Sequence, residues 1–395
     1  MTYDFTTNVN RLAQGSAKWQ QMMALSPDIP ADTVPLSVAD TDFRHPPELI
    51  DELKSYLDSM VLGYTQPTIS YYEAVTNWFA RRHQWQVEKE WLLLSPGVVA
   101  ALYHGVKAYT KPGDGVLILS PVYYPFRRAI ENSGRRVVAS SLIDTGGYYS
   151  IDFTDLEAKA RLSRNKLLLF CSPHNPVGRV WTREELQAVD RICRKHDVIV
   201  ISDEIHFDLI MPGIRHKVFS SLSPAAAANS VILTAPSKSF NLAGLQTANV
   251  VIADLNLRQA YQAQQASEGF QLLNVIGPKA CELVYDTCEP WLEQFLNQVA
   301  VNRRFFHHFM SEHLPMITVS PMEGTYLQWF NCQELGMTDA ELNTFLIHEC
   351  HLVLDPGHLF GEEGQHYQRM SLACPTQVLT ESLERLAKKI KELNR

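Results

Sequence analysis

Short apolar runs alternate with helical patterns through the middle of the chain. Six runs are mostly apolar, namely residues 116–120, 136–140, 166–170, 198–202, 231–235 and 249–253. Strands buried on both faces show such continuous runs, because helices cover both sides of a parallel sheet. Residues 182–196 lie between two runs and carry a helical pattern, with Thr182 and Glu185 spaced as a capping box. The pattern predicts an α/β domain with a mostly parallel central sheet.

The two ends of the chain show different patterns. Residues 1–45 are irregular and contain prolines, whereas amphipathic helices and short strands alternate from about residue 290 onward. A chain of 395 residues exceeds what one hydrophobic core usually serves. We therefore expect a large α/β domain over residues 46–288. A smaller α+β domain would combine residues 289–395 with the N-terminal segment, residues 1–45.

Composition and charge narrow the class of protein. Apolar residues make up 46% and charged residues 20%, as in ordinary globular proteins. The formal net charge of −8, without a dense Lys/Arg block, argues against a nucleic-acid or membrane-surface partner. The sequence shows neither a signal-peptide pattern nor an apolar run near the ~18 residues of a membrane span. The 7 scattered cysteines lack a CxxC pair, which indicates reduced thiols in a cytoplasmic protein without a metal site.

Polar side chains follow four of the predicted strands at their carboxyl ends. They are Tyr123 and Tyr124, then Asn175, then Asp203 with His206, and finally Lys238. Each of them alone is equally compatible with a turn former, a helix cap or a core aromatic. Ligands of open α/β sheets bind outside the carboxyl ends of the strands, so we expect these side chains to meet in one pocket.

A lysine and an aspartate in one buried pocket are the pair that pyridoxal 5′-phosphate (PLP) chemistry requires. The lysine, Lys238, would form a Schiff base with the cofactor aldehyde, and Asp203 would keep the pyridine nitrogen protonated. A turn at Gly97 between a strand and a helix leaves N–H groups free to hold a phosphate. An ordinary strand–turn–helix connection has the same pattern. The chain has neither a P-loop nor a complete GxGxxG fingerprint, so a nicotinamide cofactor has no support.

Six motifs in chain order closely resemble the fold-type-I PLP enzymes. They are SPGVVAA, PGDGVLILSPVYYPF, CSPHNPVGRVWTREEL, SDEIHFDLI, APSKSFNLAGLQ and RMSLACP. The similarity extends from about residue 40 to Pro375. It is greatest to the C–S lyase branch, which contains cystathionine β-lyases of the MalY/PatB type and cystalysin. Aminotransferases of this superfamily usually carry a phosphate-contacting arginine where this chain has Gln246.

The resemblance implies a role for each cofactor-binding position in the large domain. Lys238 would form the Schiff base and later act as general base, together with Asp203 at the pyridine nitrogen and Tyr123 stacked on the ring as the catalytic set. Asn175 and His206 would lie near the ring O3′. Four residues would hold the phosphate, namely Gly97, Val98, Val99 and Ser237.

The resemblance also implies substrate contacts and a homodimer. Arg369 would bind the substrate α-carboxylate through a bidentate pair. Tyr124, Val38 and Ala39 would lie on the substrate side of the pocket. Tyr64 would reach the cofactor from a partner subunit, so that two chains share their active sites.

The reaction that we expect is α,β-elimination from a cysteine S-conjugate, such as cystathionine or cysteine itself, to pyruvate, ammonia and a thiol. An aminotransferase would share the first steps, but Gln246 favours the lyase branch. A third interpretation is a regulatory binding protein that has kept the fold. The intact set of Lys238, Asp203, Asn175 and Arg369 favours retained catalysis.

Overall fold

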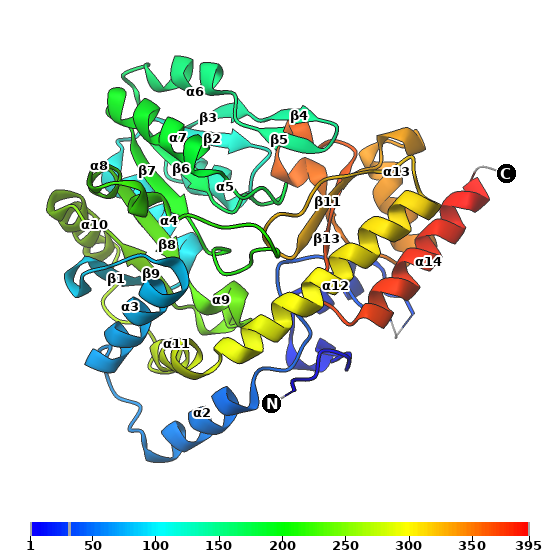
Figure 1. Cartoon of the computed structure of the whole chain (residues 1–395), viewed down its shortest axis with the longest axis horizontal. Helices are drawn as coiled ribbons and strands as arrows, with labels where there is room; N and C mark the ends of the chain where they lie inside the picture. Colours follow the sequence, from blue (N-terminus) through cyan, green and yellow to red (C-terminus); the bar gives the residue numbers. More distant parts are fainter. Residues whose placement is uncertain (1, 31–32, 394–395) are drawn as a thin grey trace.

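The computed structural model describes residues 2–30 and 33–393, and its largest element is a seven-stranded sheet of order β1-β9-β8-β7-β6-β2-β3 (Figure 1). The strands are β1 (Leu92–Ser95), β2 (Gly115–Ser120), β3 (Arg136–Ser141), β6 (Asn165–Cys171), β7 (Ile199–Asp203), β8 (Ser230–Thr234) and β9 (Ala248–Val251). Strands β3, β2, β6, β7 and β8 pair in parallel, and β9 is antiparallel to both of its neighbours. The predicted α/β fold with a mostly parallel sheet is confirmed.

Helices cover both faces of this sheet, which explains why its strands are apolar throughout. Leu117 and Leu119 of β2 belong to one buried cluster, while Val116 and Ile118 belong to the other. The helices that follow or flank the strands are α3 (Ile69–His83), α4 (Val98–Tyr109), α5 (Pro125–Glu131), α6 (Phe153–Ala160), α7 (Arg183–Lys195), α8 (Pro224–Ala228), α10 (Leu255–Ser267) and α11 (Ile276–Thr287). Helix α7 begins with the predicted capping box of Thr182 and Glu185.

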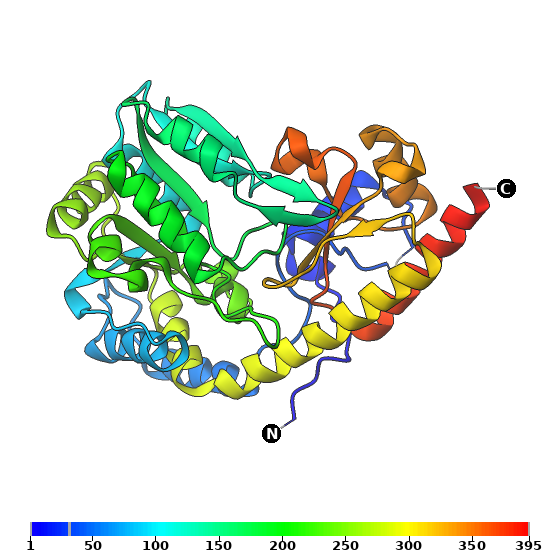
Figure 2. The same cartoon turned by 45° about the horizontal axis from the view of Figure 1, so that its top comes forward.

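A second, antiparallel sheet of order β10-β11-β13-β12 lies beside the first (Figure 2). Its strands are β10 (Thr318–Val319), β11 (Leu327–Asn331), β12 (Asp355–Pro356) and β13 (Tyr367–Ser371). The 25-residue helix α12 (Glu289–His313) extends from α11 past this sheet and packs against α14 (Thr376–Leu393). Within the described ranges, no helix is both long and apolar enough to cross a membrane.

Most of the remaining elements are short. They are the helices α1 (Ala17–Leu25), α2 (Pro47–Ser59), α9 (Pro236–Ser239) and α13 (Asp339–Thr344), the hairpin β4 (Ile143–Thr145) and β5 (Tyr148–Ser150), a π-helical turn (Phe345–Glu349), and the 3₁₀ turns Leu12–Gln14, Lys89–Trp91, Phe219–Leu222, Ala243–Leu245, Gln333–Leu335, Gly357–Phe360 and Glu362–Gly364. Among them, α9 begins two residues after β8 ends and carries the candidate lysine, Lys238.

The N-terminal segment joins the two parts of the chain. The backbone of Leu36 donates to the Val353 carbonyl at 3.1 Å and accepts from the Ser371 N–H at 2.8 Å, both in the C-terminal part. The Thr41 N–H donates to the side chain of Asn241 at 3.1 Å, just after α9. The division into residues 46–288 and residues 1–45 with 289–395 remains our proposal.

A buried cation fixes the turn that follows β6. Arg179 is 1% exposed, and its guanidinium donates to Glu323 at 2.9 Å, to Glu185 at 3.0 Å and to the Tyr149 carbonyl. The Val180 N–H donates to the same Glu323 carboxylate at 2.9 Å. Since Glu323 lies between β10 and β11, this ion pair connects the turn of the large sheet to the small sheet.

We expect Arg179→Ala to lower the free energy of unfolding by about 3–5 kcal/mol, because it leaves two carboxylates without their buried cation. Urea unfolding followed by circular dichroism measures the loss. Arg164→Ala is the matched control, since that arginine is exposed. Equal stability of the two variants would contradict this account of the turn.

Candidate active site

A cavity of about 510 Å³ opens at the carboxyl ends of β2, β6, β7 and β8. Every predicted site residue except Tyr64 lines it: Val38, Ala39, Gly97, Val98, Val99, Tyr123, Tyr124, Asn175, Asp203, His206, Ser237, Lys238 and Arg369. Strands β12 and β13 of the small sheet supply Asp355 and Arg369. The cavity therefore lies at the carboxyl strand ends that the sequence pattern predicted, and residues of the small sheet complete it.

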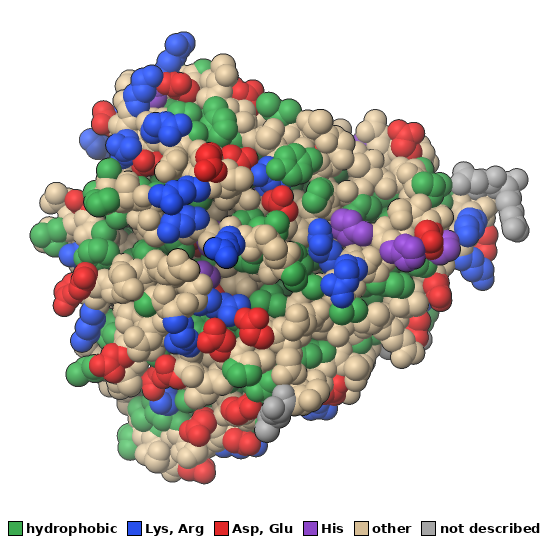
Figure 3. All heavy atoms as spheres, viewed as in Figure 1, with side chains coloured by type: hydrophobic (Ala, Val, Ile, Leu, Met, Phe, Trp, Pro, Cys, Tyr) green, Lys and Arg blue, Asp and Glu red, His purple; other side chains and the backbone are tan. Residues whose placement is uncertain are grey.

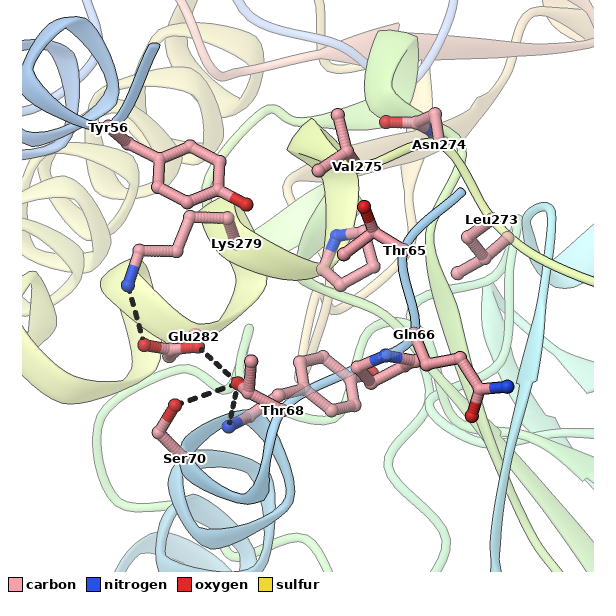
Figure 4. A pocket seen from close by; sticks show the side chains of 13 residues that line it. Tyr56, Thr65, Gln66, Thr68, Ser70, Leu273, Asn274, Val275, Lys279 and Glu282 are labelled. Carbon is pink, nitrogen blue, oxygen red and sulfur yellow. Dashed lines mark hydrogen bonds and ion pairs between the residues drawn. The ribbon is translucent and has the colours of Figure 1, made fainter. Parts of the chain in front are cut away.

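A second, smaller hollow shares no residue with this cavity (Figure 4). It lies between residues 65–71 and α11, and several of its polar groups pair with one another. Lys279 donates to Glu282 at 2.7 Å, and the hydroxyls of Thr68 and Ser70 are 2.8 Å apart. This lysine is already paired with a carboxylate at the protein surface, so the hollow lacks the free amine that cofactor chemistry needs.

Lys238 lies on the wall of the large cavity, in the single turn of α9 that Pro236 begins. Its Nζ donates a hydrogen bond of 2.6 Å to the carbonyl of Ala39. Enclosure by protein lowers the pKa of Lys238 to about 8, with the charge of Asp40 opposing and that of Arg369 adding to the shift. An amine with this pKa is partly neutral near pH 7, as a nucleophile or general base must be.

Asp203 ends β7 and faces the cavity. Burial raises the pKa of its carboxyl to about 7, although the Ile205 N–H, which donates at 3.1 Å, and the charge of Lys238 both favour the ionised form. A carboxylate in such surroundings needs a cationic partner. Nearby His206 is buried, and burial holds its pKa well below the ordinary value, so its ring is neutral. In the part of the chain that the structure describes, its Nδ1 atom has no hydrogen-bond partner.

The anion cradle lies between β1 and α4. Gly97 has a φ of +95° and precedes Val98, the first residue of α4, whose first N–H groups lack partners within the helix. A Cβ atom at Gly97 would meet nothing within 4 Å, so the backbone conformation, and not space, requires glycine here. Ser237 and Gln246 line the same cavity. The cradle is suited to a phosphate held by backbone N–H groups.

Arg369 in β13 is 2% exposed and is held by two partners on different elements. Its Nε and one terminal nitrogen donate to Asp355 at 3.2 and 2.5 Å, and the other terminal nitrogen donates to Asn175 at 2.8 Å. Asp355 occupies the side of the guanidinium formed by Nε and one terminal nitrogen, and the Asn175 oxygen accepts from the other. The bidentate contact of Arg369 with a substrate carboxylate stays a prediction.

Asp355 is a site residue that sequence reasoning missed. It lies 14 residues before Arg369, and only the pairing of β12 with β13 brings the two opposite each other. Its carboxylate also accepts the Val38 N–H at 2.9 Å. Val38 has a φ of +54°, a left-handed conformation that a β-branched residue rarely adopts. Strain of this kind concentrates at functional sites, and here it places the neighbouring Ala39 carbonyl against Lys238.

The two predicted tyrosines lie together at the end of β2. The Tyr123 N–H donates to the Asn175 carbonyl at 3.0 Å, and the rings of Tyr123 and Tyr124 are 5.2 Å apart. Burial, aided by Tyr124, raises the pKa of Tyr123, so its phenol is neutral. The guanidinium carbon of Arg128 lies over the Tyr124 ring, 4.7 Å from the ring centroid.

Tyr64 is the predicted site residue that this chain does not bring to its own cavity. It is fully exposed, and the adjacent Val61 and Leu62 are 82% and 69% exposed. The prediction assigned Tyr64 to the site of a partner subunit. Its position outside the cavity agrees with that assignment and does not test it.

The cavity as a whole fits PLP. Lys238 offers an amine to an aldehyde, Asp203 offers a carboxylate to a pyridine nitrogen, and the Gly97 cradle offers N–H groups to a phosphate. The free Nδ1 of His206 provides a further polar atom beside the expected ring. Arg369 remains for the carboxylate of an amino acid.

The fold and the site together define a fold-type-I, PLP-type enzyme. Residues 31–390 match the aminotransferase class I and II family, and the chain belongs to this family. Cystathionine beta-lyase PatB of Bacillus subtilis is 37% identical to it, over 97% of this chain and 98% of the relative. Protein MalY of Escherichia coli is 29% identical, over 98% and 99% of the two chains.

A solved structure supports the same family and the same branch of it. The crystal structure of cystalysin from Treponema denticola, which contains a PLP cofactor, matches with a TM-score of 0.98 and 44% identity over 100% of both chains. The predicted membership of the C–S lyase branch is confirmed.

We expect Asp203→Asn to change how the stability of the cofactor-free protein depends on pH. Because the folded-state pKa of Asp203 is raised, its contribution to stability is present below about pH 4 and is lost as pH rises through 7. A shift of about three pKa units corresponds to roughly 4 kcal/mol at most. Urea midpoints between pH 4 and 7.5 should therefore fall less in Asp203→Asn than in the wild type. Asp28→Asn, at an exposed position, should follow the wild type; parallel curves for all three proteins would exclude the raised pKa.

Proposed function

We propose that this chain is a PLP-dependent carbon–sulfur lyase that catalyses α,β-elimination from cysteine S-conjugates to give pyruvate, ammonia and a thiol. The observation that carries the proposal is the cavity in which the Lys238 amine, the Asp203 carboxylate and the Arg369 guanidinium converge. The names of the relatives, cystathionine beta-lyase and cystalysin, support the reaction class and the cofactor. Gln246, in place of the arginine usual in aminotransferases, supports the lyase assignment.

PLP bound at this site would withdraw electrons from the substrate Cα. The protein residues then have two tasks. Arg369 holds the α-carboxylate and thereby directs the Cα–H bond toward Lys238. The neutral amine of Lys238, oriented by its hydrogen bond to the Ala39 carbonyl, takes the proton from Cα. The Cβ–S bond breaks with its electron pair on sulfur, and the remaining aminoacrylate is hydrolysed to pyruvate and ammonia.

We further propose a cytoplasmic homodimer without a nucleic-acid or membrane partner. The apolar segment around Tyr64 supports an interface, because Val61, Leu62 and Tyr64 are exposed side by side. The 7 cysteines are all free and buried, in agreement with a reducing compartment. On the face drawn in Figure 3, basic and acidic side chains are interspersed and do not form one extended basic surface.

We expect purified protein with PLP and L-cystathionine to release pyruvate and ammonia in equal amounts over many turnovers. Lys238→Ala should lower this rate by about 10²–10⁴-fold, because the general base is lost. Lys111→Ala, a change of an exposed lysine, should retain the wild-type rate. Transfer of the amino group to an added keto acid without ammonia would overturn the lyase assignment and indicate an aminotransferase.

We expect Tyr64→Ala and Lys238→Ala to be nearly inactive alone and to complement each other when they are co-expressed. A mixed dimer would have one complete site, with Lys238 from one chain and Tyr64 from the other. Random pairing should restore about a quarter of the wild-type activity per subunit. Co-expression of Lys238→Ala with Asp203→Asn is the matched control, because both changes lie in the same chain's contribution to the site. If Tyr64→Ala with Lys238→Ala stays inactive like this control, the shared site is excluded.

A further inference from the structure

A buried acid lies behind the candidate lysine and takes no part in the cavity lining. Asp208 follows β7 in the chain, and its side chain is 0% exposed. Three donors surround its carboxylate, Ser239 at 2.6 Å, His83 at 2.7 Å and Trp78 at 3.2 Å, and Arg82 forms an ion pair with it at 3.3 Å. Such a concentration of donors on one buried carboxylate holds it in a single orientation.

The donor Ser239 immediately follows Lys238. Helix α9 has only four residues, and few backbone hydrogen bonds stabilise it, among them Phe240 N–H to Pro236 and Leu242 N–H to Ser237. A helix this short has no stability of its own, so tertiary contacts must set its position. The hydrogen bond from the Ser239 hydroxyl to Asp208 is such a contact, one residue away from the reactive amine.

Asp208 belongs to the same loop as Asp203. Within this loop the Phe207 N–H donates to the Glu204 carbonyl and the Leu209 N–H donates to the His206 carbonyl, both at 2.9 Å. The loop is therefore tightly turned, and it carries the carboxylate expected at the pyridine nitrogen at its start. Its end holds the lysine-bearing turn. One segment thus sets the distance between Asp203 and Lys238, the two groups that would hold the cofactor.

The charge of Asp208 is retained despite its burial. Burial would raise the pKa of the carboxyl, but the His83 hydrogen bond and the charge of Arg82 hold it below its ordinary value. His83 itself stacks on Phe207, with ring centroids 4.0 Å apart. A hydroxyl donates a stronger hydrogen bond to a charged carboxylate than to a neutral acceptor, so the charge of Asp208 strengthens its hydrogen bond with Ser239.

We propose that Asp208 is a positioning residue for Lys238: by holding the Ser239 hydroxyl, it fixes α9 relative to Asp203, so that the amine reaches both the cofactor and the substrate Cα. The part of the inference that concerns the substrate Cα rests on the proposed function. The part that concerns the placement of the lysine against the cofactor does not depend on the reaction. The role is one of geometry, because Asp208 touches neither the cavity nor a substrate.

The test compares Ser239→Ala with Ser140→Ala in the PLP-loaded protein. Ser140 is buried like Ser239, and its hydroxyl donates to Asp155 at the same 2.6 Å, but it lies on β3, away from the cavity. Each change removes one serine–aspartate hydrogen bond, which is buried for Ser239 and part-buried for Ser140, so both variants should show a lower melting temperature. Ser239→Cys, with a weaker donor of similar size, is the conservative variant.

We expect only Ser239→Ala to bind PLP about tenfold more weakly and to shift the pH midpoint of the bound cofactor's absorbance. Its kcat for elimination should fall about tenfold with KM within about twofold, and Ser239→Cys should give intermediate values. If Ser239→Ala matches Ser140→Ala in PLP affinity and absorbance, Asp208 is merely structural and the proposal is wrong. If the wild type eliminates no thiol, the lyase proposal fails, while PLP affinity and absorbance still decide the positioning role.

Discussion

The structure depends on keeping an amine and a carboxylate in one desolvated cavity without letting them pair. Lys238 donates to the Ala39 carbonyl, whereas Asp203 accepts from the Ile205 N–H. Burial therefore moves both groups toward neutrality, with the pKa of Lys238 lowered to about 8 and that of Asp203 raised to about 7. Each group is poised to react with a ligand that has an aldehyde at one end and a basic ring nitrogen at the other. The large sheet, with its two buried faces, supplies the rigid strand ends that this arrangement requires.

The N-terminal segment couples the cofactor end of the cavity to the substrate end. The Val38 N–H holds Asp355, which in turn holds Arg369, and the next residue, Ala39, orients Lys238 through its carbonyl. Two adjacent residues thus connect Arg369, the proposed carboxylate-binding group, to Lys238, the proposed general base. The left-handed backbone at Val38 is the energetic cost of this connection. Because Asp355 forms an ion pair with Arg369, the buried cation has a compensating charge.

The parts of the fold and site that the sequence predicted are those with local signals. Continuous apolar runs marked the strands because both faces of the sheet are buried, and Thr182 with Glu185 marked the start of α7. The cavity residues at the strand ends followed because parallel strands bring their ends together, whereas Arg369, Val38 and Ala39 were implied only by the family resemblance. Asp355 was missed because its role depends on the register between β12 and β13, and no short-range pattern encodes that register. The conformation of Val38 was missed because no glycine, asparagine or aspartate marks it.

The composition of the phosphate end of the cavity bears on the proposed contribution of a second chain. Among the described residues that line the cavity, Lys238 and Arg369 are the only lysine and arginine side chains, and both are engaged elsewhere. With Gln246 in place of an arginine, a phosphate would be held by the N–H groups at the start of α4 and by hydroxyl groups such as that of Ser237. Neutral donors bind a dianion less strongly than a guanidinium does. An additional hydroxyl from a partner's Tyr64 would therefore contribute more here than in a site that contains the arginine.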